Sequence, residues 1–194
     1  MNRSAMPIIR RVQPSDLLHL NVCNLDPYTE NYDLNFYLTY LMRWPSLFQC
    51  IEEHGQIVGY IIGKVETSPA QLQGSPHYLP WHGHITALSI APQYRRLGYG
   101  KLLSEALEKA CNQQNAWFVD LFVRKSNTNA IKMYESMGYS TYRTVVRYYA
   151  DDPTGISQDG EDALDMRKPL DRDKDRIHVR ENGESFKVDP EDVF

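Results

Sequence analysis

The pattern of apolar and polar residues changes its period several times along the chain, and each change marks a predicted element. Short apolar runs bounded by turn residues predict strands at 8–12, 47–53, 57–66, 84–92, 117–124, 141–149 and 162–170. Apolar residues at helical spacing predict helices at about 17–25, 34–44 and 100–111, and a shorter one between an Asn-rich cap and Gly138. The predicted order, β-α-α-β-β-β-α-β-α-β-β, indicates a mixed α/β fold.

The predicted helix at 34–44 is apolar on almost all sides. One face is formed by leucines, a tyrosine and a methionine, and the other side carries Phe36, Tyr40 and Trp44. A helix of this kind is either deep in a core or covered by another molecule. Both readings stay open on periodicity alone.

Composition narrows the class of protein. Of the 194 residues, 42% are hydrophobic and 24% are charged, which is typical of a globular protein. A net charge of -4 gives no support for a broad nucleic-acid or bilayer-binding face. The three cysteines are scattered without a CxxC pair, and the first residues lack the apolar stretch of a signal peptide. We therefore expect a cytoplasmic protein with no direct contact to nucleic acid or membrane.

Residues 88–103, LSIAPQYRRLGYGKLL, join an apolar strand to a helix through two arginines and two glycines. Helix N-terminal amides, glycines that admit a close backbone approach and neighbouring guanidinium groups suit a phosphorylated ligand. The glycines follow the fourth predicted strand and no acidic residue stands where a ribose would need it, so the pattern is not a Rossmann motif. No Gly-Lys-Ser/Thr follows, which excludes a P-loop.

The segment from Arg95 to Gly100 matches the R/Q-x-x-G-x-G/A acetyl-CoA motif of the GNAT N-acetyltransferases. Further along, Asn127, Tyr134 and Gly138-Tyr139 resemble the second signature of that family. The resemblance implies an α/β (α+β) GNAT fold, with a central, mostly antiparallel sheet flanked by helices, over residues 1–170. Residues 171–194 are highly charged and have little to bury, so we expect a mobile tail.

Several stretches are also similar to the catalytic subunits of NatB-type N-terminal acetyltransferases, among them LDPYTENY, WHGHITALSIAP and FVDLFVR. The similarity implies acetyl transfer from acetyl-CoA to the α-amine of nascent chains that start Met-Asp, Met-Glu, Met-Asn or Met-Gln. It also implies a heterodimer with a large helical auxiliary subunit, which links the enzyme to ribosomes, with the helix around Phe36 to Trp44 in or near the interface.

The family resemblance assigns the cofactor-binding residues. The amides from Arg96 to Lys101 would hold the pyrophosphate of acetyl-CoA, and the pantetheine arm would pair with the main chain of the strand edge. Asn127 would cap its helix and lie near the cofactor. The full set is Leu88, Ser89, Ile90, Arg95, Arg96, Leu97, Gly98, Tyr99, Gly100, Lys101 and Asn127.

Catalytic roles follow from the same resemblance. Tyr134 stands where the family has a hydroxyl that can protonate the leaving thiolate, and a phenol is a suitable donor to a thiolate. Because a large fraction of α-amine is already neutral near pH 7.5, a strong base is unnecessary, and Glu30 or His84 could assist it through water. Glu30, Tyr32, His84 and Tyr148 match positions at the peptide entrance, where His84 and a tyrosine hydroxyl could donate to the oxygen of the second side chain.

Other readings remain open. Tyr134 could simply pack on the sheet, His84 could bond to backbone, and Glu30 could be a solvated cap. The two histidines of His82-Gly83-His84 lack the further ligands of a metal site, so we expect no metal. The alternative functions are a GNAT enzyme with a different acceptor, such as other N-termini or lysine, and a CoA-binding subunit without turnover.

Overall fold

The computed structural model describes residues 6–25, 28–75, 78–150 and 160–193. The chain forms two compact units, one of Met1–Lys64 with Ile85–Ala110 and one of Val65–His84 with Cys111–Phe194. The stretch LDPYTENY includes residues 26–27, which lie outside the described residues. No helix in the described part of the chain is long and apolar enough to cross a membrane.

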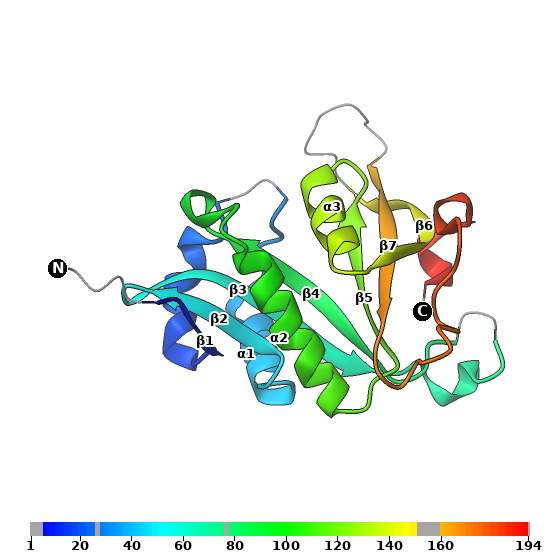
Figure 1. Cartoon of the computed structure of the whole chain (residues 1–194), viewed down its shortest axis with the longest axis horizontal. Helices are drawn as coiled ribbons and strands as arrows, with labels where there is room; N and C mark the ends of the chain where they lie inside the picture. The colour runs from blue at the N-terminus through cyan, green and yellow to red at the C-terminus, as the bar shows by residue number, and fades with distance from the viewer. Residues whose placement is uncertain (1–5, 26–27, 76–77, 151–159, 194) are drawn as a thin grey trace. The chain divides into compact units, whose positions relative to one another are not determined.

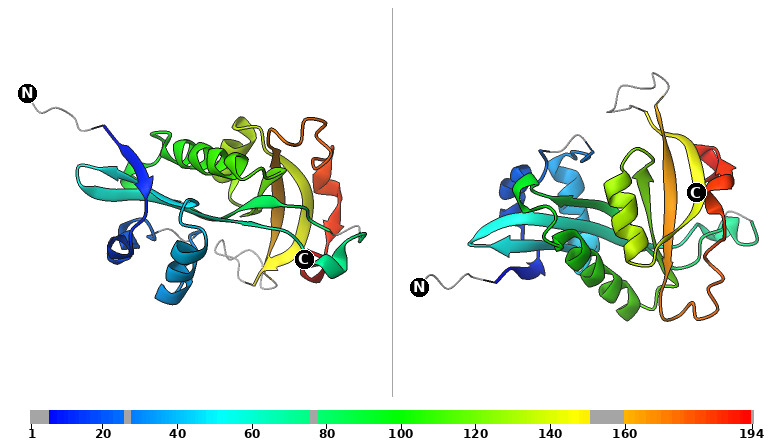
Figure 2. Two further views of the ribbon diagram at one scale, coloured as in Figure 1. Left: turned by 90° about the horizontal axis from the view of Figure 1, so that it is seen from below. Right: turned by 45° about the horizontal axis from the view of Figure 1, so that its top comes forward.

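The first unit is a layered arrangement of strands and helices. Its strands are β1 (Ile8–Arg11), β2 (Phe48–Glu53) and most of β3 (Gln56–Glu66) and β4 (His82–Ile90), in the order β1-β2-β3-β4. The β1·β2 and β2·β3 pairs are antiparallel. The 3-10 helix η1 (Pro14–Val22) and α1 (Leu34–Arg43) cover one face, and α2 (Tyr99–Gln113) covers the other (Figure 2).

Apolar side chains from η1, α1 and the strands form the core on one face of the first unit. The aromatic residues Tyr37, Tyr40, Phe48 and Tyr60 are buried there with aliphatic neighbours. The predicted helix at 34–44 therefore has a buried side, yet Leu34 and Met42 are 55% and 83% exposed. Some apolar side chains of this helix therefore pack in the core of the unit, and others face outward.

The second unit carries the remaining strands, β5 (Phe118–Arg124), β6 (Ser140–Tyr149), β7 (Glu161–Pro169) and β8 (Lys187–Val188), in the order β5-β7-β6-β8. The β5·β7 and β6·β7 pairs are antiparallel, and β6·β8 is parallel. In Figure 1, α3 (Thr128–Ser136) lies on one side of these strands and the C-terminal segment lies on the other. The mostly antiparallel, mixed fold predicted from the sequence is confirmed.

The structure corrects two local predictions. The first predicted helix is a 3-10 helix that begins at Pro14, where Asp16 accepts hydrogen bonds from the Gln13 amide (2.7 Å) and from Arg10. The strand expected to begin at residue 84 begins at His82, so both histidines lie on β4. Four short 3-10 helices and β8 have no counterpart in the prediction, because segments of two or three residues carry no readable period.

The C-terminal segment, residues 171–193, makes contacts with its unit, whereas the sequence predicts a mobile tail. Arg143 on β6 donates to the carbonyls of Asp192 and Val193, and Val193 is fully buried. The buried carboxylate of Asp173 accepts from the amides of Ile177 and His178. Hydrogen-bonded charged groups and the buried side chain of Val193, which packs with Val145 and Ala163, together hold this segment against its unit.

Candidate active site

The turn between β4 and α2 exposes the main chain that the sequence predicts for cofactor binding. After β4 the chain forms a short 3-10 helix, η3 (Pro92–Tyr94), and then passes through two residues with left-handed backbone, Arg96 (φ 66°) and Gly98 (φ 86°). Arg95, Arg96, Leu97 and Gly98 are all exposed. The αL conformation is unusual for arginine, so the turn holds a conformation that is not the intrinsic preference of its sequence.

The first amides of α2 are left without helical partners. The Leu102 amide donates to the Gly98 carbonyl at 3.1 Å, which starts the helical ladder. The amides of Tyr99, Gly100 and Lys101 precede that bond and have no carbonyl within the helix. Together with the positive end of the helix dipole, these amides have the chemistry that an anion site requires, independent of any particular side chain.

Side chains beneath this turn hold it in place. The buried Tyr99 side chain donates from its hydroxyl to Glu53 Oε2 at 2.7 Å, an interaction that also raises the pKa of Tyr99. The Arg95 Nε donates to the Ile90 carbonyl at 3.1 Å. Ser104 on the second turn of α2 donates to the Gly100 carbonyl. These contacts connect the turn to β2, β4 and α2 and so reduce the conformational freedom of its free amides.

On the strand predicted to pair with the cofactor, the side chains of the two faces differ in how deeply they are buried. Leu88 and Ile90 are half-buried, whereas Ser89 is 4% exposed and donates from its hydroxyl to the Cys23 carbonyl. Its hydroxyl also lies 3.3 Å from that of Thr29. The Ser89 side chain is therefore used inside the fold, and only its main chain remains a candidate for cofactor binding.

In the second unit, His84 forms a hydrogen-bonded pair with a carboxylate that the sequence analysis did not single out. The His84 Nδ1 lies 2.8 Å from Asp120 Oδ1, and Asp120 is buried. Burial by itself raises the pKa of Asp120, but the charges and hydrogen bond supplied by His82 and His84 outweigh it and lower the pKa. Asp120 is thus a carboxylate, which can only accept, so the proton of this hydrogen bond is on His84 Nδ1.

The ring of Phe122 connects His84 to Tyr148. Phe122 stacks on Tyr148 with ring centroids 4.8 Å apart, and its centroid is 5.7 Å from that of His84. Tyr149 also contacts this group. Its hydroxyl donates to the Phe122 carbonyl, and the Arg124 guanidinium carbon lies 3.9 Å from the centroid of the Tyr149 ring. Two of the four predicted peptide-site residues therefore belong to one cluster.

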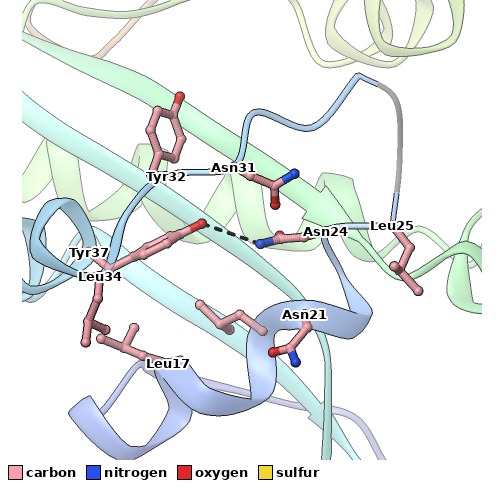
Figure 3. A pocket seen from close by; sticks show the side chains of 9 residues that line it. Leu17, Asn21, Asn24, Leu25, Asn31, Tyr32, Leu34 and Tyr37 are labelled. Atoms are coloured by element: carbon pink, nitrogen blue, oxygen red, sulfur yellow. Dashed lines mark hydrogen bonds between the residues drawn. The ribbon is translucent and has the colours of Figure 1, made fainter.

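Glu30 and Tyr32, the other two predicted peptide-site residues, belong to the first unit. Glu30 is exposed, and Tyr32 stacks on Phe36 of α1 with centroids 3.9 Å apart. Tyr32 also lines an open pocket of about 470 Å³ between η1 and α1, where Asn24 and Tyr37 point toward one another (Figure 3). Their roles in peptide binding stay predictions.

Tyr134 and Asn127 occupy α3. Tyr134 is 5% exposed and meets Tyr139 edge to face, with centroids 5.2 Å apart. Asn127 is the N-cap of the helix, because its side chain accepts from the Ala130 amide. The predicted cap is confirmed, and the catalytic role of Tyr134 stays a prediction. Gly138 adopts a left-handed φ of 93° directly after the helix.

Sequence reasoning missed Asp120 and Phe122. Both lie in FVDLFVR, an apolar run whose one carboxylate interrupts an otherwise hydrophobic strand, and that interruption was the available signal. Nothing local connects this carboxylate to a histidine 36 residues earlier in the chain. Within the described residues, no three His, Cys, Asp or Glu side chains are arranged to hold a metal ion.

Comparison with known proteins settles the family. The model of the acetyltransferase (GNAT) family matches residues 16–139. The chain belongs to the GNAT acetyltransferase family. Within it, the catalytic subunit of the N-terminal acetyltransferase B complex from Schizosaccharomyces pombe is 45% identical over 189 residues, which cover 95% of this chain and 97% of the relative. The chain is thus an acyltransferase of the N-terminal acetyltransferase branch.

Solved structures agree with this placement. The crystal structure of Chaetomium thermophilum Naa20 in complex with a bisubstrate analogue has 56% identity and a TM-score of 0.93, with 96% of this chain and 99% of that chain covered. A NatB acetyltransferase complex bound to CoA and MES has 40% identity and a TM-score of 0.69, with 84% and 99% covered. The GNAT fold predicted from the two sequence signatures is confirmed.

Proposed function

We propose that this chain is the catalytic subunit of a NatB-type complex that transfers the acetyl group of acetyl-CoA to the α-amine of proteins starting Met-Asp, Met-Glu, Met-Asn or Met-Gln. The observation that carries the proposal is the similarity, over almost the whole of both chains, to catalytic subunits of N-terminal acetyltransferase B complexes. The site geometry supplies the physical support.

Acetyl-CoA is the co-substrate in this proposal. Its pyrophosphate would bind to the free amides of Tyr99, Gly100 and Lys101, with Arg95 and Arg96 nearby. The main chain of Leu88, Ser89 and Ile90 would pair with the pantetheine arm. Every one of these groups except the two guanidiniums is a backbone group, so the cofactor is recognised by the shape of the turn.

The reaction itself needs a neutral amine and a proton for the departing thiolate. The amine attacks the thioester carbonyl and forms the amide bond, and the bond to sulfur breaks. The nitrogen gives its surplus proton to water, and the thiolate takes a proton from the Tyr134 hydroxyl, which regains one from solvent. Tyr148 and His84 would bind the peptide, and Glu30 and Tyr32 would line its entrance. We expect the acetyl group to pass directly from acetyl-CoA to the amine, without an acyl-cysteine intermediate. Burial raises the pKa of Cys23 to about 12 and of Cys50 to about 11, which disfavours the thiolate that an acyl carrier needs.

The outward surface of η1 and α1 is the proposed site of the large helical auxiliary subunit. Both elements and the residues directly after η1 carry exposed apolar side chains, and an open pocket lies between η1 and α1 (Figure 3). A monomer rarely leaves such a surface uncovered. The exposed residues are Leu18, Val22, Leu25, Leu34 and Met42. Through this partner the enzyme would work in the cytoplasm on chains emerging from ribosomes.

An acetylation assay with a panel of peptides tests the proposal. The chain, alone and with its auxiliary subunit, is given acetyl-CoA and peptides that start Met-Asp, Met-Asn, Met-Leu or Ser, and an N-blocked lysine peptide. We expect Met-Asp and Met-Asn to be used well above the rest. Equal use of Met-Leu or Ser, or activity on lysine alone, would replace the substrate assignment by another GNAT acceptor; CoA binding without product would indicate a non-catalytic subunit.

A further inference from the structure

A buried row of alternating charges crosses the second unit from His84 to the C-terminal segment. Asp120 on β5 is the register partner of Arg167 on β7. Arg167 donates to Asp165 at 3.0 Å, and Asp165 also accepts from the Arg143 Nε at 2.8 Å. The four groups are all less than 5% exposed. A histidine at the end of this row is therefore in contact with a fixed and buried charge.

The row determines which atom of His84 is available to a peptide. Because Nδ1–H donates to the Asp120 carboxylate, Nε2 is the remaining nitrogen of the ring. The His84 side chain is 15% exposed, in contrast to 2% for His82. The second histidine has its Nδ1 2.7 Å from the Pro80 carbonyl and its Nε2 3.6 Å from Asp120, so its ring is used within the fold.

Charge balance favours a cationic ring when an acidic peptide is bound. The two carboxylates of the row, Asp120 and Asp165, face the two guanidiniums, Arg143 and Arg167, and the buried His82 ring has its Nε2 3.6 Å from Asp120. A proton on His84 Nε2 adds one positive charge beside Asp120, and the side chain of a second-position Asp or Glu would neutralise it. The doubly protonated ring donates from Nε2–H to a carboxylate or amide oxygen, whereas leucine offers no acceptor.

We propose that Asp120 is a positioning residue that makes His84 a cationic hydrogen-bond donor, and that it thereby sets the preference for acidic over amide side chains at the second peptide position. The inference rests on the proposed function and states which interaction distinguishes side chains at the second peptide position. Asp120 itself touches no substrate in this scheme. It fixes the orientation of the ring and supplies the negative charge that the imidazolium needs.

The decisive variant is Asp120→Asn, assayed in the full chain with its auxiliary subunit. An asparagine can rotate to donate its NH₂ group to Nδ1, so a neutral His84 would still present Nε2–H to an amide oxygen. We expect kcat/KM for a Met-Asp peptide to fall about tenfold more than for a Met-Asn peptide, the size of a charge-assisted hydrogen bond over a neutral one. An equal fall for both peptides would overturn the proposal.

Asp173→Asn is the matched control. Asp173 is also 2% exposed and lies in the same unit, but it accepts from the amides of Ile177 and His178 and not from a histidine ring of β4. We expect it to leave the ratio between the two peptides unchanged. A shift in that ratio equal to the Asp120→Asn shift would mean that loss of stability alone changes specificity, which contradicts the proposal.

A measurement on the unaltered chain covers the case in which Asp120→Asn fails to fold. With ¹⁵N-labelled histidine and a bound Met-Asp peptide, the His84 nitrogens should both show the chemical shifts of protonated imidazolium. A bare Nε2 in that complex would overturn the proposal. Failure of the proposed function is distinguishable, because it appears in the unaltered enzyme as a flat preference among Met-Asp, Met-Asn and Met-Leu.

Discussion

The turn before α2 and the cluster around His84 prepare their binding sites in opposite ways. In the turn, main-chain amides are the candidate binding groups, and their positions follow from a few consecutive residues between Arg95 and Lys101. In the cluster, side chains from separate strands meet, and a buried carboxylate on β5 orients a histidine on β4. The first site is local in sequence, and the second exists only after β4 and β5 are in place.

This difference predicts how each site responds to substitution. A backbone site tolerates changes of side chain but not changes of backbone conformation, because only the latter move the amides. A side-chain site loses its function when one polar group is removed, even if the packing of the ring is kept. The following experiments test the contrast, beginning with the largest expected effect.

Removal of residues 189–194 tests whether the side-chain region depends on the end of the chain. The truncation takes away Val193, which is fully buried, and the two carbonyls that accept from Arg143. We expect the free energy of unfolding to fall by about 3 kcal/mol, from lost apolar burial and unsatisfied polar groups. Urea denaturation measures this. An unchanged midpoint would restore the original view of a mobile tail.

Tyr134→Phe tests the dependence on a single polar group. The ring and its edge contact with Tyr139 are kept, so stability should change little. We expect kcat to fall about 100-fold while the KM for acetyl-CoA stays the same, because only the proton donor is lost. Tyr139→Phe removes a hydroxyl from the partner ring and serves as the control, with kcat unchanged. Equal losses in both variants would argue for packing.

Gly98→Val tests the dependence of the turn on backbone conformation. The added side chain meets no atom within 4 Å, but a β-branched residue is strained at a φ of 86°. We expect the KM for acetyl-CoA to rise about tenfold as the turn relaxes away from its amide-presenting form. Gly55→Val, in the β2–β3 hairpin, has the same open space and a φ of 77°. It should lower stability without raising that KM.

Leu97→Ala has the smallest expected effect. Leu97 lies in the middle of the acetyl-CoA motif and is 57% exposed, so its side chain is not needed to hold the turn. We expect the KM for acetyl-CoA to change less than about twofold, since the binding groups are amides. Isothermal titration with CoA gives an independent reading. A large loss would show that the side chain itself contacts the cofactor.

Much of the fold could be predicted because its signals are local. The apolar run of β5, the His54-Gly55 hairpin, the Asn127 cap and the glycines of the α2 turn each act within a few residues. The nature of the C-terminal segment could not be predicted in this way. Its contacts include Arg143 and Asp173, charged groups that sequence reasoning counts as solvated, together with the buried Val193.

The sequence by itself determined the family and the glycine-containing turn before α2, because both depend on short motifs with fixed backbone consequences. Only the tertiary structure decided that Asp120 orients His84, that Phe122 joins His84 to Tyr148, and that the Ser89 hydroxyl is used inside the fold. Those contacts join residues many positions apart. Strand pairing brings these residues together, and a buried carboxylate then needs a hydrogen-bond donor. No local sequence pattern specifies which residue that donor is.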